Sequence, residues 1–564
     1  MKILVMSLLR IGDIVLAAPV LRGLREKHPQ AEIHLLINSQ FKAITPLIPY
    51  IDKTIPFDRE GLQKGLGSAT APMFGSYDRL DGFLENLDTE NYDWVINLTH
   101  SRLSGWLMSL LSAKQKTGLC LDGEGRASFG SSWFRYLNSQ VDVDGSEVFH
   151  FTDVFRFALG LDDDDMSRPA LCETDSGHRE ADGFLAGSAS GGMIVVQALT
   201  SDPKKDWSLA KMADAITQTA RVHPASEFAI LGAPFEKDRL VPLVDRLVER
   251  GVRARLAILS FEGAFSLLKR SKLLITLDTS IKHLACAART PVVEISIGSS
   301  DYHRTGAYLQ GSIILQSKEA CAPCTHSKAC HRESHACSER LPSDVVAMVA
   351  SEVLAGRAFQ LKTIAEEYRD EVEILRVESR VSGYWAAYSV LEPFAEASVA
   401  RWVDLACRKV WLETQGSDPK ALGTGTEILR LARLLRSIHP DVSETDWRHL
   451  LSELEQQAMT VEGRLNGFKV GLQYLRGCYE DPRKLRDYVR QLIAFRDRIR
   501  HSPLLRSYKA ALDPLIEDDI SPAFTRYKRM VETVAEIEKR TEISLRILRG
   551  LNGEIVEPKG LERA

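Results

Sequence analysis

The sequence predicts a doubly wound α/β protein that continues into an all-helical domain. Through about residue 355, short apolar runs alternate with segments of helical spacing, as parallel strands and their crossover helices do. Between residues 161 and 192 lies a stretch with few strand signals, which divides the alternating region in two. From about Gly356 the pattern changes to long segments rich in Leu, Arg, Glu and Ala, separated by Gly, Pro and Asp turns.

The amino-terminal segment predicts a strand, a loop, a helix and a second strand. An apolar run from Ile3 to Leu8 precedes a polar corner containing Gly12, and apolar residues at helical spacing follow until a Lys-His-Pro stop. Arg10 and Asp13 interrupt the roughly 7–15 apolar residues that a secretory signal needs, so an export signal is excluded. Asp13 is therefore expected at the carboxyl end of a strand, where open α/β sheets bind ligands.

The remaining strands of the α/β region are expected to be buried, because their apolar runs are nearly continuous. They are Trp94–Leu98, Met193–Gln197, Phe228–Leu231, Leu273–Leu277 and Val292–Ile295. The division of the chain that follows is an α/β domain at residues 1–175, a second α/β domain at 176–355 and a helical extension at 356–564.

The helical extension is expected to be a compact bundle, since opposite charges are interspersed and no sustained heptad stands out. Its predicted helices are Leu361–Ser379, Tyr384–Trp411, Thr424–Ile438, Trp447–Leu475, Lys484–Ile499 and Ala523–Leu548. Three roles for this domain remain open: self-association into a homo-oligomer, docking of a protein acceptor, and peripheral contact with the inner membrane surface.

Bulk composition excludes several classes of protein. The 564 residues are 44% hydrophobic and 26% charged, and the formal net charge of −4 gives no electrostatic basis for binding nucleic acid. No apolar run approaches the roughly 18 residues of a membrane-spanning helix. Nine cysteines without a signal peptide indicate a reducing compartment, and the cytoplasm is the expected location.

Three places along the chain carry residues suited to chemistry. Asp13 is placed to act as a general base or to cap the following helix. Lys204 and Lys205 stand where a strand turns into a helix, a position that suits an anion such as a diphosphate, although solvated lysines would also fit the pattern. The third place is the segment from Lys272 to Ser296.

In the third place, a buried strand ends at Asp278, and Thr279 and Ser280 open a helix. His283 lies one turn after Thr279 on the same face. Free amides at such a helix start bind phosphate oxygens, and the carboxylate can accept from a sugar hydroxyl. The alternative is a capped helix with a packed histidine. Lys282 adds a cation beside the expected diphosphate.

Together these stretches resemble the glycosyltransferases of family nine, the ADP-heptose:lipopolysaccharide heptosyltransferases. RIGDIVLAAPVLRGLREKHP is similar to the amino-terminal R-x-G-D signature of that family, KKDWSLAKMADA to its K-x-W phosphate loop and LDTSIKHLACAARTPVVEI to its D-T-G-x-x-H-L-A segment. The resemblance covers roughly residues 1–355. Ser280 stands where the family generally has glycine, which bears on the identity of the donor sugar.

The resemblance implies a GT-B architecture, in which two Rossmann-like domains face a cleft, with the acceptor on the first and a nucleotide-sugar such as ADP-heptose on the second. It implies that Asp13 is the catalytic base. It also implies a donor-binding set, which comprises Lys205, Glu236, Asp278, Thr279, Ser280 and His283.

A cysteine cluster follows the second α/β region, in the sequence CAPCTHSKACHRESHAC. Its C-x2-C pair is typical of one half of a tetrahedral zinc or iron site, which would be structural because sugar transfer needs no activated water. Reduced or disulfide-linked thiols are the alternative. The four candidate ligands are Cys321, Cys324, Cys330 and Cys337.

The expected function is inverting transfer of a sugar, a heptose by resemblance, from a nucleoside-diphosphate donor to a lipopolysaccharide or other cell-envelope glycan. No cofactor is expected to take part in catalysis. Two alternatives remain open at this point: a protein O-heptosyltransferase, and an inactive relative that serves as an interaction platform.

Overall fold

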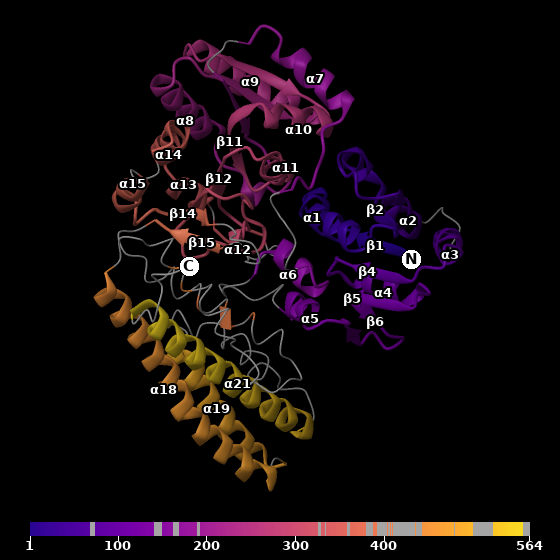
Figure 1. The fold of residues 1–564 in the computed structure, drawn as a ribbon, viewed down its shortest axis with the longest axis vertical. Coiled ribbons are helices and arrows are strands. Elements are labelled where there is room, and N and C mark those ends of the chain that lie inside the picture. The colour runs from indigo at the N-terminus through magenta and orange to yellow at the C-terminus, as the bar shows by residue number, and fades with distance from the viewer. Residues whose placement is uncertain are drawn as a thin grey trace, which may run out of the picture. The chain divides into compact units, whose positions relative to one another are not determined.

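The computed structural model describes residues 1–67, 74–139, 149–161, 168–188, 192–324, 329–332, 334–357, 361–378, 387–391, 443–478, 480–499 and 523–556, together with residues 403, 406, 407, 409, 432 and 435. The chain divides into two compact units. The first takes in most of residues 1–393 and contains both α/β domains, and the second contains the long helices that follow (Figure 1).

The first α/β domain has a five-stranded parallel sheet in the order β3-β2-β1-β4-β5. Its strands are β1 (Lys2–Ser7), β2 (Glu32–Asn38), β3 (Lys53–Phe57), β4 (Trp94–Asn97) and β5 (Gln115–Gly118), and β6 (Cys120–Leu121) with β7 (Ala127–Ser128) forms a separate hairpin. Its helices are α1 (Ile11–Lys27), η1 (Ser39–Leu47), α2 (Arg59–Gly67), α3 (Gly75–Asp88), α4 (Arg102–Leu110), α5 (Ser132–Ser139) and α6 (Phe151–Ala158). Helix crossovers keep the strands parallel, as predicted.

The second α/β domain has an eight-stranded sheet in the order β10-β9-β8-β11-β12-β13-β14-β15. The first six of these strands are parallel and follow the doubly wound order of nucleotide-binding domains. The strands are β8 (Met193–Gln197), β9 (Glu227–Gly232), β10 (Ala254–Ile258), β11 (Ser271–Leu277), β12 (Val292–Ser296), β13 (Ile313–Ser317), β14 (Val372–Glu378) and β15 (Ala387–Val390). The expectation of two Rossmann-like domains, the GT-B architecture, is confirmed.

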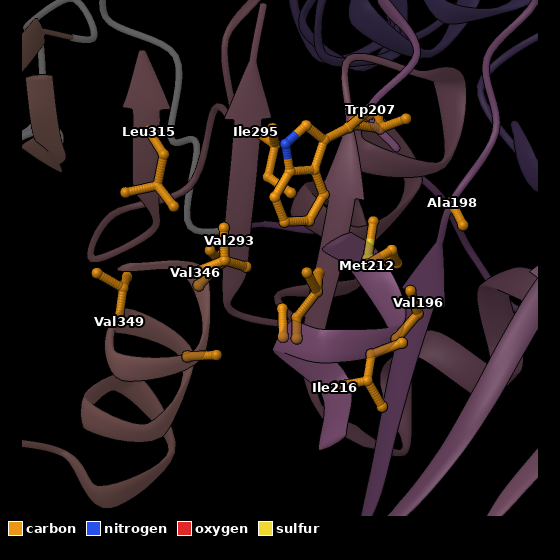
Figure 2. Packing of buried hydrophobic residues seen from close by; sticks show 14 of the residues in the cluster. Val196, Ala198, Trp207, Met212, Ile216, Val293, Ile295, Leu315, Val346 and Val349 are labelled. Carbon is orange, nitrogen blue, oxygen red and sulfur yellow. The ribbon is translucent and has the colours of Figure 1, made fainter. Parts of the chain in front are cut away.

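Helices cover this second sheet and bury its apolar side chains. They are α7 (Asp175–Leu185), η2 (Pro203–Lys205), α8 (Leu209–Val222), η3 (Pro234–Glu236), α9 (Lys237–Glu249), α10 (Phe261–Lys269), α11 (Ser280–Ala288), α12 (Tyr302–Thr305), α13 (Ala336–Arg340), α14 (Ser343–Ala355) and α15 (Leu361–Glu367). Figure 2 shows Trp207 lying over the sheet among Ile295 and Met212, all three of them buried. Burying each such side chain stabilises the fold by roughly 1.5–3 kcal/mol, so the loop that carries Trp207 is firmly anchored.

The prediction of a helix over Leu361–Ser379 is wrong beyond Glu367, where α15 ends. The chain then forms β14, which pairs antiparallel with β13 and in turn with β15. Val372, Ile374 and Val377 are buried in β14, and such β-branched residues favour a strand that packs on a sheet edge. Part of the predicted helix Tyr384–Trp411 is likewise strand β15; most of that helix, and of Thr424–Ile438, lies outside the described residues.

Three of the predicted helices of the extension are confirmed as α18 (Glu444–Arg476), α19 (Pro482–Ile499) and α21 (Ala523–Val556). The sequence analysis found no sustained heptad, yet the buried residues of α18 and α21 include a series that recurs at alternating spacings of three and four residues, as in a coiled coil. In α18 these positions are Trp447, Leu451, Leu454, Ala458, Val461, Leu465, Phe468, Leu472 and Leu475, and in α21 they are Met530, Val534, Ile537, Thr541, Ser544, Leu548 and Leu551.

Helices α18 and α21 run antiparallel. Lys469 pairs with Glu538 at 2.5 Å, and Glu455, about four turns closer to the start of α18, pairs with Arg549 at 2.8 Å. None of the helices in the part of the chain that the structure describes is both long and apolar enough to cross a membrane.

Gly471 permits α19 to pack closely on α18. A Cβ at this position would lie 2.8 Å from Cε2 of Tyr488, whose hydroxyl donates to the carbonyl of Phe468 at 3.1 Å and is thereby held in place.

We expect Gly471→Ala to destabilise the helical unit by about 1–3 kcal/mol through overpacking, seen as a lower unfolding temperature in calorimetry of the full chain. Gly463→Ala, where a Cβ meets nothing within 4 Å, is the matched control and should stabilise by about 0.5–1 kcal/mol. Equal unfolding temperatures for the two variants would contradict this packing.

Candidate active site

The three stretches singled out in the sequence all follow strands at the points where the strand order of a sheet reverses. Asp13 comes after β1, which lies between β2 and β4. Lys205 comes after β8 and Asp278 after β11, and these two strands are neighbours at the centre of the second sheet. Open α/β sheets bind ligands outside the carboxyl ends of their strands at this point.

Asp13 lies in the first turn of α1 and not in a loop before it, because the helix already begins at Ile11. Its Oδ2 accepts a hydrogen bond from the amide of Arg10 at 3.0 Å, so the carboxylate caps the helix start. Polar side chains at the ends of neighbouring strands fix the preceding residues. The amide of Leu8 donates to Oγ1 of Thr99 at 2.8 Å, and Nδ2 of Asn38 donates to the carbonyl of Leu8 at 2.6 Å.

Gly12 serves a different purpose from the one its sequence suggests. It does not have a positive φ, so it is not needed for a sharp turn. A Cβ on Gly12 would instead lie 3.2 Å from Cδ2 of His283 and 3.9 Å from Cα of Ser280. The missing side chain therefore lets the first turn of α1 approach α11 of the second domain, and this contact brings Asp13 towards the expected donor site.

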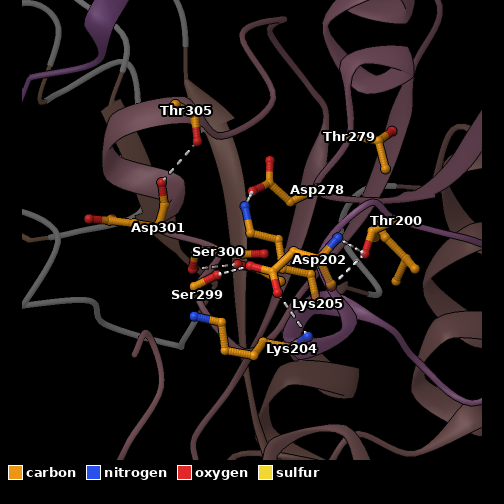
Figure 3. A network of polar contacts seen from close by, with 12 residues as sticks. Thr200, Asp202, Lys204, Lys205, Asp278, Thr279, Ser299, Ser300, Asp301 and Thr305 are labelled. Carbon is orange, nitrogen blue, oxygen red and sulfur yellow. Dashed lines mark hydrogen bonds and ion pairs between the residues drawn. The ribbon is translucent and has the colours of Figure 1, made fainter. Parts of the chain in front are cut away.

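Lys205 ends a short 3-10 turn whose geometry is fixed on both sides. Asp202 accepts from the amide of Lys204 at 3.1 Å and from the hydroxyl of Ser299 at 3.1 Å, as Figure 3 shows. On the other side, the indole of Trp207 donates to the carbonyl of Leu341 at 3.3 Å. The side chain of Lys205 is 8% exposed and reaches Asp278, where its ammonium lies 2.5 Å from Oδ2.

Asp278 is the centre of a buried charge cluster. Its Oδ2 accepts from Lys205 and its Oδ1 from Lys282, each at 2.5 Å. The ammonium of Lys282 also lies 2.6 Å from Oε1 of Glu294 in β12. Burial raises the pKa of Asp278, but Lys282 and Lys205 outweigh this effect and hold it well below its usual range. The cluster therefore contains an ionised carboxylate between two ammonium groups.

Asp13 and His283 have shifted pKa values with opposite consequences. Burial raises the pKa of Asp13 to about 6, the amide and charge of Arg10 lower it, Asp278 raises it and Lys205 lowers it. Asp13 therefore lies close enough to the charge cluster on the second domain for Asp278 and Lys205 to shift its pKa. Burial, together with Lys282, lowers the pKa of His283 to about 3, so this imidazole is neutral at pH 7. Its Nδ1 is buried with no hydrogen-bond partner among the described residues.

The other residues of the expected donor set lie at the starts of helices. Thr279 is the N-cap residue of α11, but its side chain accepts no hydrogen bond from the amides of the first turn. Ser280 is the first residue of α11 and lies beside Gly12. Glu236 makes its described hydrogen bond within its own turn, where Oε2 accepts from the amide of Ala233 at 2.8 Å. Asp13, Lys205, Asp278 and His283 thus lie close to one another, whereas the carboxylate of Glu236 caps its own turn.

The four cysteines of the cluster are free thiols in the structure. Within the described ranges, the one group of three ligand atoms close enough to hold a metal is formed by Glu32, His34 and Glu90 near the amino ends of the strands of the first sheet, and Lys2 and Lys53 already pair with Glu90 there. Burial raises the pKa of the Cys324 and Cys337 thiols, which disfavours the thiolate that a metal binds. A structural metal at these cysteines stays a prediction, and no chemistry is assigned to it.

Glu294 is the charged residue that the sequence analysis missed. It is almost completely buried in the apolar strand β12, where it accepts from Lys282 and from the amide of Ala307 at 2.8 Å. A single acid within the buried run VVEIS was the available signal, because a buried carboxylate requires a partner. The sequence analysis instead placed its partner, Lys282, beside the diphosphate of the donor.

Comparison with known proteins shows what the α/β part of the chain is similar to. The family model described as glycosyltransferase family 9 (heptosyltransferase) matches residues 82–335. Lipopolysaccharide heptosyltransferase 3 of Escherichia coli is 23% identical over 300 residues, which cover 52% of this chain and 82% of that protein. Lipopolysaccharide heptosyltransferase 1 of Pseudomonas aeruginosa is 23% identical over 330 residues, which cover 57% of this chain and 86% of that protein.

Among solved structures, a family 9 glycosyltransferase from Veillonella parvula aligns with a TM-score of 0.49 and 18% identity, covering 63% of this chain and 97% of that one. The family resemblance is confirmed by the family-model match, which covers two of the three motifs, and by the aligned relatives.

The contact between Gly12 and His283 can be tested directly. In Gly12→Ala, the new methyl group would push the imidazole of His283 away by a few tenths of an ångström and separate α1 from α11. We expect turnover to fall about tenfold, since small misplacements of reacting groups are costly, while the unfolding temperature changes little. Gly82→Ala on α3, where a Cβ meets nothing within 4 Å, is the control and should retain full turnover. Full turnover in both variants would contradict the role given to this contact.

Proposed function

We propose that this chain, a glycosyltransferase with a family 9 domain, transfers a heptose from a nucleoside-diphosphate donor to a glycan of the lipopolysaccharide type, with inversion at the anomeric carbon. The names of the aligned relatives support the sugar and the acceptor class. The observation that carries the proposal is the position of Asp13 in the first turn of α1, beside Gly12, whose Cβ position lies 3.2 Å from Cδ2 of His283 on the other α/β domain.

The second α/β domain binds the donor in this proposal. Lys205 ends a rigid turn beside the uncapped first turn of α11, and together they offer an ammonium and backbone amides to a diphosphate. As the bond to the sugar breaks, negative charge collects on the diphosphate, and these groups stabilise it. Glu236 stands after β9, where its carboxylate is proposed to contact the nucleoside ribose.

The first α/β domain supplies the base and binds the acceptor. Asp13 accepts the proton of an acceptor hydroxyl while that oxygen attacks the anomeric carbon from the face opposite the diphosphate. The bond from the acceptor oxygen to the sugar forms as the bond from the sugar to the diphosphate breaks, and the proton stays on Asp13. A base with a pKa of about 6 is ionised at pH 7 and remains a competent proton acceptor.

Substitution of the base tests this function. We expect Asp13→Asn to lower turnover with ADP-heptose by about 10²–10⁴-fold, because a positioned carboxylate contributes that much to proton transfer, while ADP affinity measured by calorimetry stays nearly unchanged. Asp81→Asn, on the exposed side of α3, is the matched control and should behave like the unaltered chain. A variant of Asp13 that keeps most of its turnover would refute its assignment as base. If a panel of nucleotide-sugars shows neither binding nor slow donor hydrolysis with the unaltered chain, an inactive interaction platform becomes the better account.

The raised pKa of Asp13 predicts a pH dependence. Only the ionised carboxylate accepts a proton, so kcat/KM should be on a plateau above the pKa and fall as the pH drops through about 6. Below that point the fall should approach about tenfold per pH unit. The measurement is kcat/KM between about pH 4.5 and 8 with enzyme stability checked at each pH. A profile that stays flat down to about pH 4.5 would contradict a catalytic carboxylate whose pKa is raised to about 6.

A further inference from the structure

Lys282 does not occupy the position that its place in the sequence suggests. The sequence places it beside the expected diphosphate, but its side chain is 0% exposed and lies beneath Asp278. Its ammonium is shared between Oδ1 of Asp278 at 2.5 Å and Oε1 of Glu294 at 2.6 Å. A ligand above Asp278 therefore meets Lys205 and the first turn of α11, and not Lys282.

The two oxygens of Asp278 are each occupied by one ammonium. Lys205 holds Oδ2 and Lys282 holds Oδ1. The ammonium of Lys282 repels that of Lys205 while Asp278 attracts it, and the two effects partly cancel at Lys205. Lys205 is therefore held less strongly with Lys282 present than it would be by Asp278 alone.

We propose that Lys282 is a positioning residue that neutralises Asp278 from the buried side and so lets Lys205 share its ammonium with the diphosphate of the donor. This inference rests on the proposed function and assigns a role to a residue that does not touch the ligand. Lys282 acts through Asp278, and Lys205 is the cation that contacts the diphosphate.

Glu294 fixes Lys282 in this position. Its Oε1 accepts from Lys282, and its Oε2 accepts from the amide of Ala307 at 2.8 Å, so the carboxylate is held at both oxygens. The same pairing gives the competing explanation, in which Lys282 merely balances the buried charge of Glu294 and has no influence on the donor. The two explanations differ in what happens once Glu294 carries no charge.

The test therefore compares Glu294→Gln with the double variant Lys282→Met/Glu294→Gln. The glutamine keeps an oxygen for the amide of Ala307 and leaves no buried carboxylate to balance, so the double variant should fold. ADP is the probe, and its dissociation constant is measured by calorimetry with circular dichroism as the check on folding. We expect the double variant to bind ADP about tenfold or more weakly than Glu294→Gln, because Lys205 is then held by Asp278 alone. Lys282→Arg/Glu294→Gln, which keeps a cation, should recover most of the affinity.

A second comparison shows whether Lys282 acts through Asp278. In an Asp278→Asn/Glu294→Gln background the carboxylate that captures Lys205 is gone and Glu294 carries no charge that Lys282 would balance, so adding Lys282→Met should change ADP affinity by less than about twofold. An undiminished loss in that background would mean that Lys282 acts on the ligand directly, which would overturn the positioning role. This comparison also stands if the first double variant fails to fold.

The outcomes separate the two proposals. Equal ADP affinity in Glu294→Gln and Lys282→Met/Glu294→Gln would overturn the role of Lys282 and leave the transferase function intact. If the unaltered chain binds neither ADP nor an ADP-sugar, the proposed donor class is wrong, and the proposed role of Lys282 is then wrong as well.

Discussion

The contact between the first turn of α1 and the first turn of α11 is the constraint on which the rest of the site depends. Gly12 allows it, because a side chain there would crowd His283. The contact brings a carboxylate from one α/β domain within electrostatic reach of the Lys205–Asp278 pair on the other. Each group arrives there because it follows a central strand of its own sheet, where the strand order reverses. Two separately folded sheets thus combine into one polar site.

Burial gives the charged groups of this site different states. Asp13 has a raised pKa, which suits its proposed role as a proton acceptor. Asp278 is just as enclosed but stays ionised, since two ammonium groups flank it. His283 is held neutral by burial and by Lys282, so it adds no charge. The charged groups of the site are therefore in place before any ligand binds. Because they need not reorganise, they stabilise charge that develops during a reaction at a lower free-energy cost.

Much of this could be predicted from the sequence, because strand and helix periodicity is local. The buried strands and the order of the three motifs follow from runs such as Met193–Gln197, and Asp13, Lys205 and Asp278 were placed at strand ends on that basis. What the sequence did not reveal depends on contacts between distant segments: the steric role of Gly12, the burial of Lys282 under Asp278 and its pairing with Glu294. The strands β14 and β15 were also missed, since they depend on the pairing of β14 with the distant β13 and of β15 with β14. The heptads of α18 and α21 were present in the sequence and were overlooked.

A crystal structure of the chain with a non-transferable ADP-sugar tests the central claim most directly. The account predicts that the diphosphate lies against Lys205 and the first turn of α11, with the carboxylate of Asp13 facing the anomeric carbon from the side opposite the diphosphate. A nucleotide bound away from Lys205, or an Asp13 carboxylate directed away from the sugar, would contradict it.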